Sequence, residues 1–400
     1  MPQSSTATLM KLLTDGTSKP DNPVFIREIL ATQNPVDDRT NRVGDFETAS
    51  LKEESDAAYL QRTLTHIEKM AAHASVIHLE DNFTECEEKS SLDDYAYRGI
   101  NKLHALRPDC NNHVTRLSFN EYYFYPHQKR GPLPPLTFQA LVRGIETIAA
   151  NLPENLHLTL ASFPLLDEVD RRVANMVIYV QCGLIPALRV MAKNIAAMNE
   201  PVYPGTEPLE YCRNVFAPSF YMALGDKNNA HRSMHFSSPI VCDTRRTRFW
   251  TLIDICNDLE MGYGKQALAR ETRLRKQHSA SDLPQQITHI VISNSTFLYE
   301  DNTLSATVTH VDPSYHTLRT IASDKKWEAT IIKIEDTHST GWSELRFFPT
   351  RQIDKLPAGL LNADNTDKKK LTAGNQNIAT NTRQNKTAPR RKNFRPYSTL

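Results

Sequence analysis

The sequence predicts a layered α/β fold, and three observations point to it. Apolar residues across 24–350 switch repeatedly between the two-residue period of strands and the 3.6-residue period of helices. No linker rich in Gly, Pro or Ser and no repeat of fixed period interrupts this stretch. The chain of 400 residues is 40% hydrophobic, which suffices for one large core. We therefore expect a single large α/β domain over residues 23–350.

The first half of this domain is expected to begin with a strand and a helix. Residues 24–36 resemble a strand that the pair Asn-Pro ends. A helix is predicted over 56–74, because Leu60, Leu64 and Ile67 recur at helical spacing, and a short strand is predicted over 75–80. Two further helices and four strands are expected next: helix 92–106, strand 114–124, helix 135–152, and strands 156–164, 175–183 and 187–193.

The second half is expected to be richer in strands. A long irregular stretch occupies 199–232 and is followed by apolar, alternating segments. The expected elements are strands 233–243 and 248–256, a helix over 264–277, and strands 288–295, 304–312 and 328–336.

The two ends of the chain differ from the domain in composition. Residues 1–22 form a loose, polar N-terminal segment. From Lys368 onward the chain carries nine basic residues and no acidic ones, so we expect a disordered basic tail over 363–400. The composition favours a solubilising tail. Binding to nucleic acid or an anionic surface stays open, since only Phe394 and Tyr397 are present to stack on bases.

Cysteine usage and hydropathy predict a reduced, cytoplasmic protein. The six cysteines are scattered without a CxxC pair, and the N-terminal residues lack the apolar stretch of a signal peptide. The most apolar stretch, 174–192, contains Gln181, Pro186 and Arg189, which fit core strands better than a membrane span. We expect no membrane-spanning segment.

Three chemically reactive side chains each end an apolar strand. Alternation over 248–256 places Leu252, Asp254 and Cys256 on one strand face, and the strand stops at the thiol. Glu121 follows the strand that begins at Val114, and Lys193 ends another. Ligands meet α/β sheets at the carboxyl ends of strands. A lone cysteine is more often a core residue, but the three together indicate a reactive site.

The segments around these residues resemble motifs of the carbon–nitrogen hydrolase, or nitrilase-like, superfamily. "ATQNP" resembles the family's first strand, and "FNEYYF" resembles the segment of the catalytic base, at Glu121. "RVMAKNIAAMNEPVYPG" resembles the lysine segment, with Lys193 on the catalytic lysine and Glu200 on the supporting glutamate. "IDICNDLE" resembles the nucleophile segment, at Cys256. Over roughly residues 24–336, the resemblance implies a nitrilase-like α-β-β-α sandwich.

The resemblance also implies an activity. Glu121 would be the general base, Cys256 the nucleophile, and Lys193 with the backbone N–H of Asn257 the donors that stabilise developing charge. Glu200 would hold Lys193 or the substrate. The implied protein is a cysteine-dependent hydrolase of a nonpeptide carbon–nitrogen bond in a small amide or nitrile. It acts through a thioester or thioimidate and needs no cofactor or metal.

Several alternatives remain at this level. Glu80 also ends a short predicted strand and is an alternative base, although the helix and strands that lead to Lys193 follow Glu121 in the family's order. Asn120 and Asn257 depart from the usual motif residues, and the segment 206–245 is long. These departures leave open a catalytically drifted nitrilase-like protein that acts in binding or regulation, and a homo-oligomer.

Other known motifs are weak or missing. His231 and His235 share one face of a predicted strand, but no third metal ligand is evident nearby. The patterns GxGxxG, GxxxxGK[ST] and GxSxG do not occur, which argues against dinucleotide-binding, P-loop and serine-hydrolase proteins.

Overall fold

The computed structural model describes most of residues 23–356. The described ranges are 23–33, 54–83, 112–126, 129–168, 171–196, 203–208, 240–243, 249–269, 285–294, 298, 300–313, 317–321, 325–335 and 342–356. Contacts divide the chain into Met1–Leu356 and Pro357–Leu400, and every described residue lies in the first unit. Three predictions lie outside the described residues: the loose segment 1–22, the helix 92–106 and the basic tail 363–400. His231 and His235 lie outside them as well.

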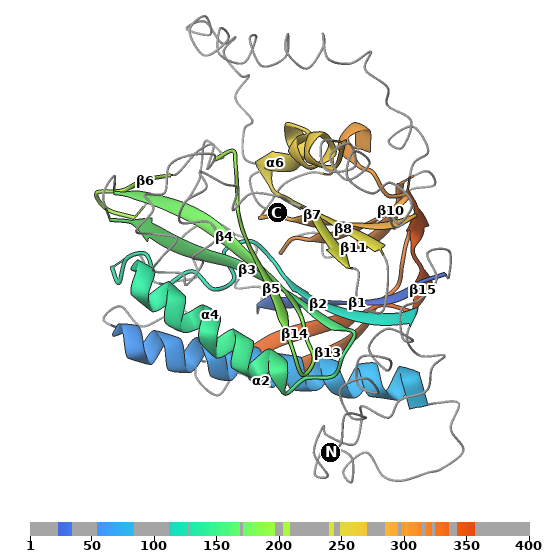
Figure 1. The fold of residues 1–400 in the computed structure, drawn as a ribbon, viewed down its shortest axis with the longest axis horizontal. Coiled ribbons are helices and arrows are strands. Elements are labelled where there is room, and N and C mark those ends of the chain that lie inside the picture. Colours follow the sequence, from blue (N-terminus) through green and yellow to red (C-terminus); the bar gives the residue numbers. More distant parts are fainter. Residues whose placement is uncertain are drawn as a thin grey trace, which may run out of the picture. The chain divides into compact units, whose positions relative to one another are not determined.

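Two β-sheets form the centre of the described structure (Figure 1). The first has the order β13-β14-β1-β2-β3-β4-β5, that is Thr330–Glu335, Trp342–Phe347, Phe25–Gln33, His113–Phe119, Leu156–Asp167, Arg172–Gln181 and Ala187–Ala192. β15 (Arg351–Gln352) pairs with β1, and β6 (Glu207–Pro208) pairs with β4. The second has the order β12-β11-β10-β9-β8-β7, that is Lys325–Lys326, Thr317–Thr320, Thr307–Val311, Gln286–Ile292, Phe249–Ile255 and Ile240–Asp243. β16 (Asp354–Lys355) pairs with β9.

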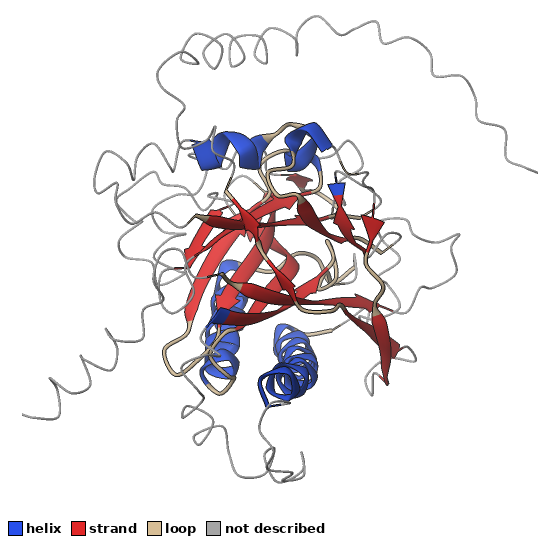
Figure 2. Cartoon of the chain, turned by 90° about the vertical axis from the view of Figure 1, so that its right-hand side faces the viewer, coloured by secondary structure: helices blue, strands red, loops and turns tan. Residues whose placement is uncertain are grey.

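Helices cover the outer face of each sheet, as Figures 1 and 2 show. The long helices α2 (Asp56–Phe83) and α4 (Pro135–Ala150) cover the first sheet. The short helix α6 (Asn257–Glu260) and the helical turn over 263–269 cover the second, and η5 (Glu300–Asn302) is a single 3-10 turn. The predicted α-β-β-α sandwich is therefore confirmed for the described residues.

The sequence of α4 explains why it forms and where it packs. Pro135 occupies the first turn, where a missing N–H costs nothing. Phe138, Leu141 and Ile145 recur at three- and four-residue spacing and are fully buried against the first sheet. α2 lies beside α4, and a Cβ on Gly144 would overlap the side chain of Leu64.

Among the described residues, no helix is long and apolar enough to cross a membrane.

The inner faces of the two sheets form a second core. Ile253 and Ile255 of β8 pack with Leu30 of β1 and with residues of β4. Leu252 and Asp254, which alternate with these isoleucines, point outward to the backbone of the covering turn, since a Cβ on Gly264 would meet both. The alternation predicted for this strand is thus confirmed. The buried residues of this core are Leu30, Ala161, Val177, Tyr179, Met191, Ile253, Ile255, Ile290, Ile292, Val311, Leu318 and Phe348.

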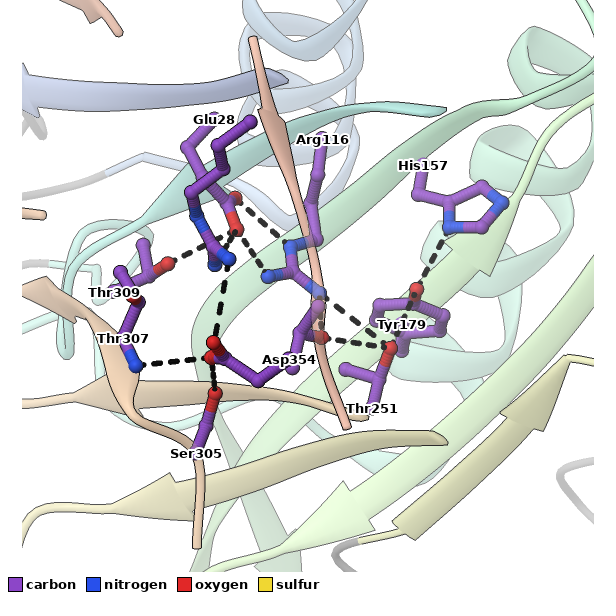
Figure 3. Close-up of polar contacts among 11 residues, drawn as sticks. Glu28, Arg116, His157, Tyr179, Thr251, Ser305, Thr307, Thr309 and Asp354 are labelled. Carbon is purple, nitrogen blue, oxygen red and sulfur yellow. Dashed lines mark hydrogen bonds and ion pairs between the residues drawn. The ribbon is translucent and has the colours of Figure 1, made fainter. Parts of the chain in front are cut away.

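A buried ion pair between two strands of the first sheet is hydrogen-bonded to the second sheet across the interior (Figure 3). Arg116 of β2 binds both carboxylate oxygens of Glu28 on β1, and neither side chain is exposed to solvent. From the second sheet, Thr288 accepts a 2.8 Å hydrogen bond from Arg116, and Thr309 donates a 2.9 Å bond to Glu28. The sheets are therefore joined by charge-assisted hydrogen bonds as well as by apolar contacts.

Residues 351–356 connect the same two sheets by pairing with an interior strand of each. β15 pairs with β1, and Ile353 donates its N–H to the carbonyl of Val24 at 2.9 Å. Three residues further on, Leu356 donates its N–H to Gln285 at 2.7 Å, and β16 pairs with β9. The Asp354 carboxylate accepts the backbone N–H of Thr307 at 2.9 Å and the hydroxyl of Ser305 (Figure 3).

The structure corrects two features of the sequence-based assignment. Residues 75–80 were predicted to be a strand, but they continue helix α2, which places Ile77 and His78 against the first sheet. The His78 Nδ1 atom lies 2.8 Å from the Thr115 hydroxyl of β2. In addition, the strands β11, β12, β14, β15 and β16 were not predicted.

The ion pair between the sheets yields a prediction about stability. Replacing Glu28→Gln removes the carboxylate but leaves the buried Arg116, so the free energy of unfolding should fall by about 3–5 kcal/mol. The double variant Glu28→Gln/Arg116→Met should recover part of this loss, because no uncompensated Arg116 charge remains. Guanidinium unfolding followed by circular dichroism measures both changes.

An ion pair with a partly exposed arginine provides the control. Arg346 lies 3.2 Å from Glu344, and their side chains are 34% and 10% exposed, so Arg346→Met should cost less than Glu28→Gln. Equal losses for Glu28→Gln and Arg346→Met would contradict a special role for the buried pair.

Candidate active site

Three side chains lie just beyond the carboxyl ends of buried strands. β2 ends at Phe119, and Glu121 occupies the turn that follows. β5 ends at Ala192, directly before Lys193, and β8 ends at Ile255, directly before Cys256. The first two strands belong to one sheet and the third to the other. The predicted placement of these residues at strand ends is confirmed.

Glu121 and Lys193 form a buried ion pair. The Lys193 Nζ atom donates to Glu121 Oε1 at 2.9 Å, and the two side chains are 2% and 0% exposed. Asn175 Nδ2, from β4, donates to the same oxygen at 2.9 Å. Both donors bind the same carboxylate oxygen, which fixes the direction of the Glu121 side chain.

The turn that carries Glu121 is held on both sides. Asn120 Nδ2 donates to the Glu121 carbonyl at 2.8 Å, and the Tyr122 N–H donates to Ser162 Oγ at 3.0 Å. Tyr122 has φ 63°, a left-handed conformation that is uncommon for a residue with a bulky side chain. The following aromatic residues, Tyr123 and Phe124, pack into the core under α2 and α4. The backbone of the carboxylate is thus fixed by burial and by hydrogen bonds.

Cys256 sits in a tight turn between β8 and α6. Its backbone has φ 50° and ψ −108°, which a non-glycine residue adopts only when its surroundings hold it there. The Cys256 N–H donates to the Ile292 carbonyl of β9 at 2.7 Å, and its carbonyl accepts the Leu259 N–H at 3.0 Å. The residue is 7% exposed. Cys256 therefore occupies a constrained backbone turn directly after the carboxyl end of β8.

The turn after Cys256 contacts the loop that carries Lys193. The Asp258 carboxylate accepts the backbone N–H of Asn194 at 3.1 Å and that of Ile195 at 2.9 Å. Asn257 Nδ2 donates to the Ala196 carbonyl at 3.1 Å. Burial raises the pKa of the Asp258 carboxyl well above its usual value, and the N–H of Asn194 opposes that rise. These contacts place the cysteine turn and the lysine loop side by side across the two sheets.

The other predicted site residues have different outcomes in the structure. Glu121 and Lys193 are in direct contact, and Asn257 begins α6 beside the lysine loop. That the Cys256 sulfur lies within a few ångströms of both charged groups stays a prediction. Glu80 lies within α2 and not at the end of a strand, so the reason for considering it as a base was wrong. Glu200 lies outside the described residues.

Two residues of the site were missed as site residues by the sequence analysis. Asn175 binds the Glu121 carboxylate, and the signal for it was a single amide in an otherwise apolar strand. Asp258 binds the lysine loop, and the signal for it was an acidic residue two positions after the cysteine. Neither contact could be assigned from the sequence, because each joins segments more than fifty residues apart.

A second polar cluster occurs in the second sheet, next to β8. Ser293 Oγ lies 2.8 Å from His310 Nε2 and donates to Asp312 Oδ2 at 2.7 Å. The same histidine nitrogen is 3.9 Å from Asp312, so serine and carboxylate approach one ring atom, whereas a nucleophilic triad holds the carboxylate at the other. Burial lowers the pKa of His310 to about 4, so this histidine is neutral near pH 7. We interpret this cluster as structural.

Within the described ranges, no three His, Cys, Asp or Glu side chains are grouped so as to hold a metal ion.

Comparisons with known proteins give likenesses among solved structures. No family model matches the chain, and no curated protein matches it. Yeast (Saccharomyces cerevisiae) Nit3, a member of branch 10 of the nitrilase superfamily, has a TM-score of 0.36 at 12% identity and covers 88% of this chain and 99% of its own. The NitN amidase from Nesterenkonia sp. AN1 has a TM-score of 0.41 at 11% identity, with coverage of 88% and 99%.

A mutant of the same amidase also matches. Its structure shows covalent addition of the acetamide moiety of fluoroacetamide at the active-site cysteine, and it has a TM-score of 0.37 at 10% identity, covering 88% of this chain and 96% of its own. At these scores and identities, the likenesses assign no role to any residue of this chain.

The environments of Cys182 and Cys256 predict different reactivity. Burial raises the pKa of the Cys182 thiol well above its usual value, which suppresses its thiolate. Cys256 lies beside the lysine loop, so we expect iodoacetamide to alkylate it at least about tenfold faster than Cys182 at pH 7.5. Mass spectrometry of tryptic peptides from a labelling time course measures both rates. Alkylation of both thiols at the same slow rate would indicate that Cys256 is a core residue.

Proposed function

We propose that this chain is a cysteine-dependent hydrolase of a nonpeptide carbon–nitrogen bond in a small amide or nitrile. The observation that carries the proposal is the buried ion pair of Glu121 and Lys193, whose loop is bound to the turn of Cys256. Nucleophilic attack on a poor carbonyl electrophile needs three groups: a thiol, a base that removes its proton, and a cation that stabilises the developing negative charge.

The first half of the proposed reaction forms the covalent intermediate. Glu121 removes the proton of the Cys256 thiol, and the thiolate attacks the amide carbon, forming a C–S bond. The electron pair of the C=O bond moves onto oxygen, where Lys193 and the backbone N–H of Asn257 stabilise the negative charge. A preorganised donor at such a position contributes on the order of 3 kcal/mol. Glu121 then gives its proton to the departing nitrogen, the C–N bond breaks, and a thioester remains.

The second half regenerates the enzyme. Glu121 takes a proton from water, and the resulting hydroxide attacks the thioester carbon. The C–S bond breaks, the acid leaves, and the proton returns to the Cys256 sulfur. With a nitrile, attack of the thiolate yields a thioimidate after protonation at nitrogen, and water then adds to the same carbon.

The surrounding residues fit these roles. Asn175 shares the Glu121 oxygen that Lys193 binds, which leaves the carboxylate one fixed orientation through both proton transfers. Glu200 is assigned to Lys193 as a supporting carboxylate. The second candidate is a binding or regulatory protein of the same fold, and the low exposure of Cys256, 7%, is the observation that favours it.

Replacing the nucleophile tests the proposal. Wild-type protein is incubated with a panel of aliphatic and aromatic amides and nitriles, and intact-mass and peptide mass spectrometry detect an acyl or thioimidate adduct on Cys256. Cys256→Ala should abolish adduct and product, while circular dichroism shows a folded protein. Cys182→Ala is the matched control: it removes a buried thiol at the end of β4 and should retain turnover.

Two results would contradict the proposal. Full turnover in folded Cys256→Ala would exclude the thiol as nucleophile. A wild-type protein that forms neither adduct nor product across the panel, while Cys256 alkylates no faster than Cys182, would favour the binding protein instead.

A further inference from the structure

The Asp258 carboxylate accepts two consecutive backbone N–H groups of the lysine loop. Its Oδ1 atom accepts the N–H of Asn194 at 3.1 Å and that of Ile195 at 2.9 Å, and its Oδ2 atom lies 3.1 Å from the Asn194 nitrogen. The residue is 2% exposed, so these are contacts made away from water. The carboxylate belongs to the turn after Cys256, whereas the N–H groups belong to the residues directly after Lys193.

Lys193 therefore stands between two backbone anchors. Its own N–H continues the ladder between β4 and β5 and donates to the Asn175 carbonyl at 2.9 Å. The next two N–H groups have left the sheet, and a buried N–H without an acceptor costs about 1–3 kcal/mol. Asp258 supplies that acceptor from the second sheet. Two sets of backbone hydrogen bonds therefore set the direction in which the Lys193 side chain leaves the backbone. One is the bond from the Lys193 N–H to Asn175 within the first sheet, and the other is the pair of bonds from Asn194 and Ile195 to Asp258.

We propose that Asp258 is a positioning residue that fixes the Lys193 ammonium relative to the Cys256 sulfur. The inference rests on the proposed function, because it assigns Lys193 the role of a donor at the reacting centre. A displacement of about 1 Å at such a donor can lower a rate by about 100-fold. A carboxylate suits the task better than an amide, since both of its oxygens accept hydrogen bonds and neither atom is a donor.

Burial raises the pKa of the Asp258 carboxyl well above its usual value, and the charge of Asp254 on β8 adds to the rise. The backbone N–H of Asn194 and the Lys193 ammonium oppose it. Glu121 holds the far end of the Lys193 side chain at Nζ, 2.9 Å away.

The test measures the thiolate of Cys256 without a substrate. The rate of alkylation by iodoacetamide is followed by peptide mass spectrometry from pH 5.5 to 10 in folded protein, for the wild type, Lys193→Met, Asp258→Ala, Asp258→Asn and Asp258→Glu. The midpoint of the pH profile of the alkylation rate is compared between variants. Lys193→Met shows how loss of the lysine charge changes this midpoint. Asp354→Ala is the matched control, because Asp354 is also a carboxylate that accepts a backbone N–H, from Thr307 at 2.9 Å, in the segment that joins β15 to β16.

The expected result has three parts. Lys193→Met should raise the midpoint of the alkylation profile by about one pH unit, since a neighbouring cation stabilises the thiolate. Asp258→Ala should raise it in the same direction, Asp258→Asn should raise it less because one acceptor oxygen remains, and Asp258→Glu should restore it in part. Asp354→Ala should lower thermal stability and leave the midpoint unchanged.

The contrary results separate the two proposals. A midpoint that moves in Lys193→Met but stays at the wild-type value in Asp258→Ala and Asp258→Asn would overturn the positioning role and leave the proposed function intact. A midpoint that Lys193→Met does not move would overturn both, because no lysine effect would exist for Asp258 to control. If Asp258→Ala does not fold, the milder Asp258→Asn decides by the same criterion.

Discussion

The packing of one sheet's inner face on the other is the constraint on which the site depends. Opposed sheets pack about 10 Å apart, and here Ile253 and Ile255 fill that space against Leu30 and the residues of β4. Glu121 and Lys193 come from the first sheet and Cys256 from the second, so the distance between the sheets sets how far apart these residues lie. Apolar side chains of fixed volume determine that distance.

The inner space is not uniformly apolar, and this gives the packing a definite register. Arg116 reaches from the first sheet to Thr288 of the second, while Glu28 accepts from Thr309. Apolar contacts alone would tolerate a small slide of one sheet over the other. Hydrogen bonds to buried charges have narrow geometric limits, and a slide would leave them unmade in a medium without water. These buried polar contacts thus limit how the two sheets can be aligned.

Features determined by local periodicity could be predicted from the sequence. The alternation before Cys256 and the spacing of Phe138, Leu141 and Ile145 each depend on neighbours within one element. Residues 75–80 were assigned wrongly because Val76 and Ile77 are β-branched and favour strands in isolation, whereas α2 continues through them and buries Ile77 in the core with residues of the first sheet. The contacts of Asn175 and Asp258 depend on two distant loops meeting, which no pattern within either loop encodes.

The order of the strands along the chain has a consequence for biosynthesis. β1 lies in the interior of the first sheet, yet its antiparallel partner β14 is translated near the end of the domain, and the hydrogen bond from Arg27 to Phe348 spans 321 residues. During translation, one edge of β1 stays open while nearly the whole domain is still being made. An open strand edge is a template for pairing with another chain, and long-range pairing forms slowly. Until β14 has been translated, this edge of β1 is therefore open to pairing with other chains.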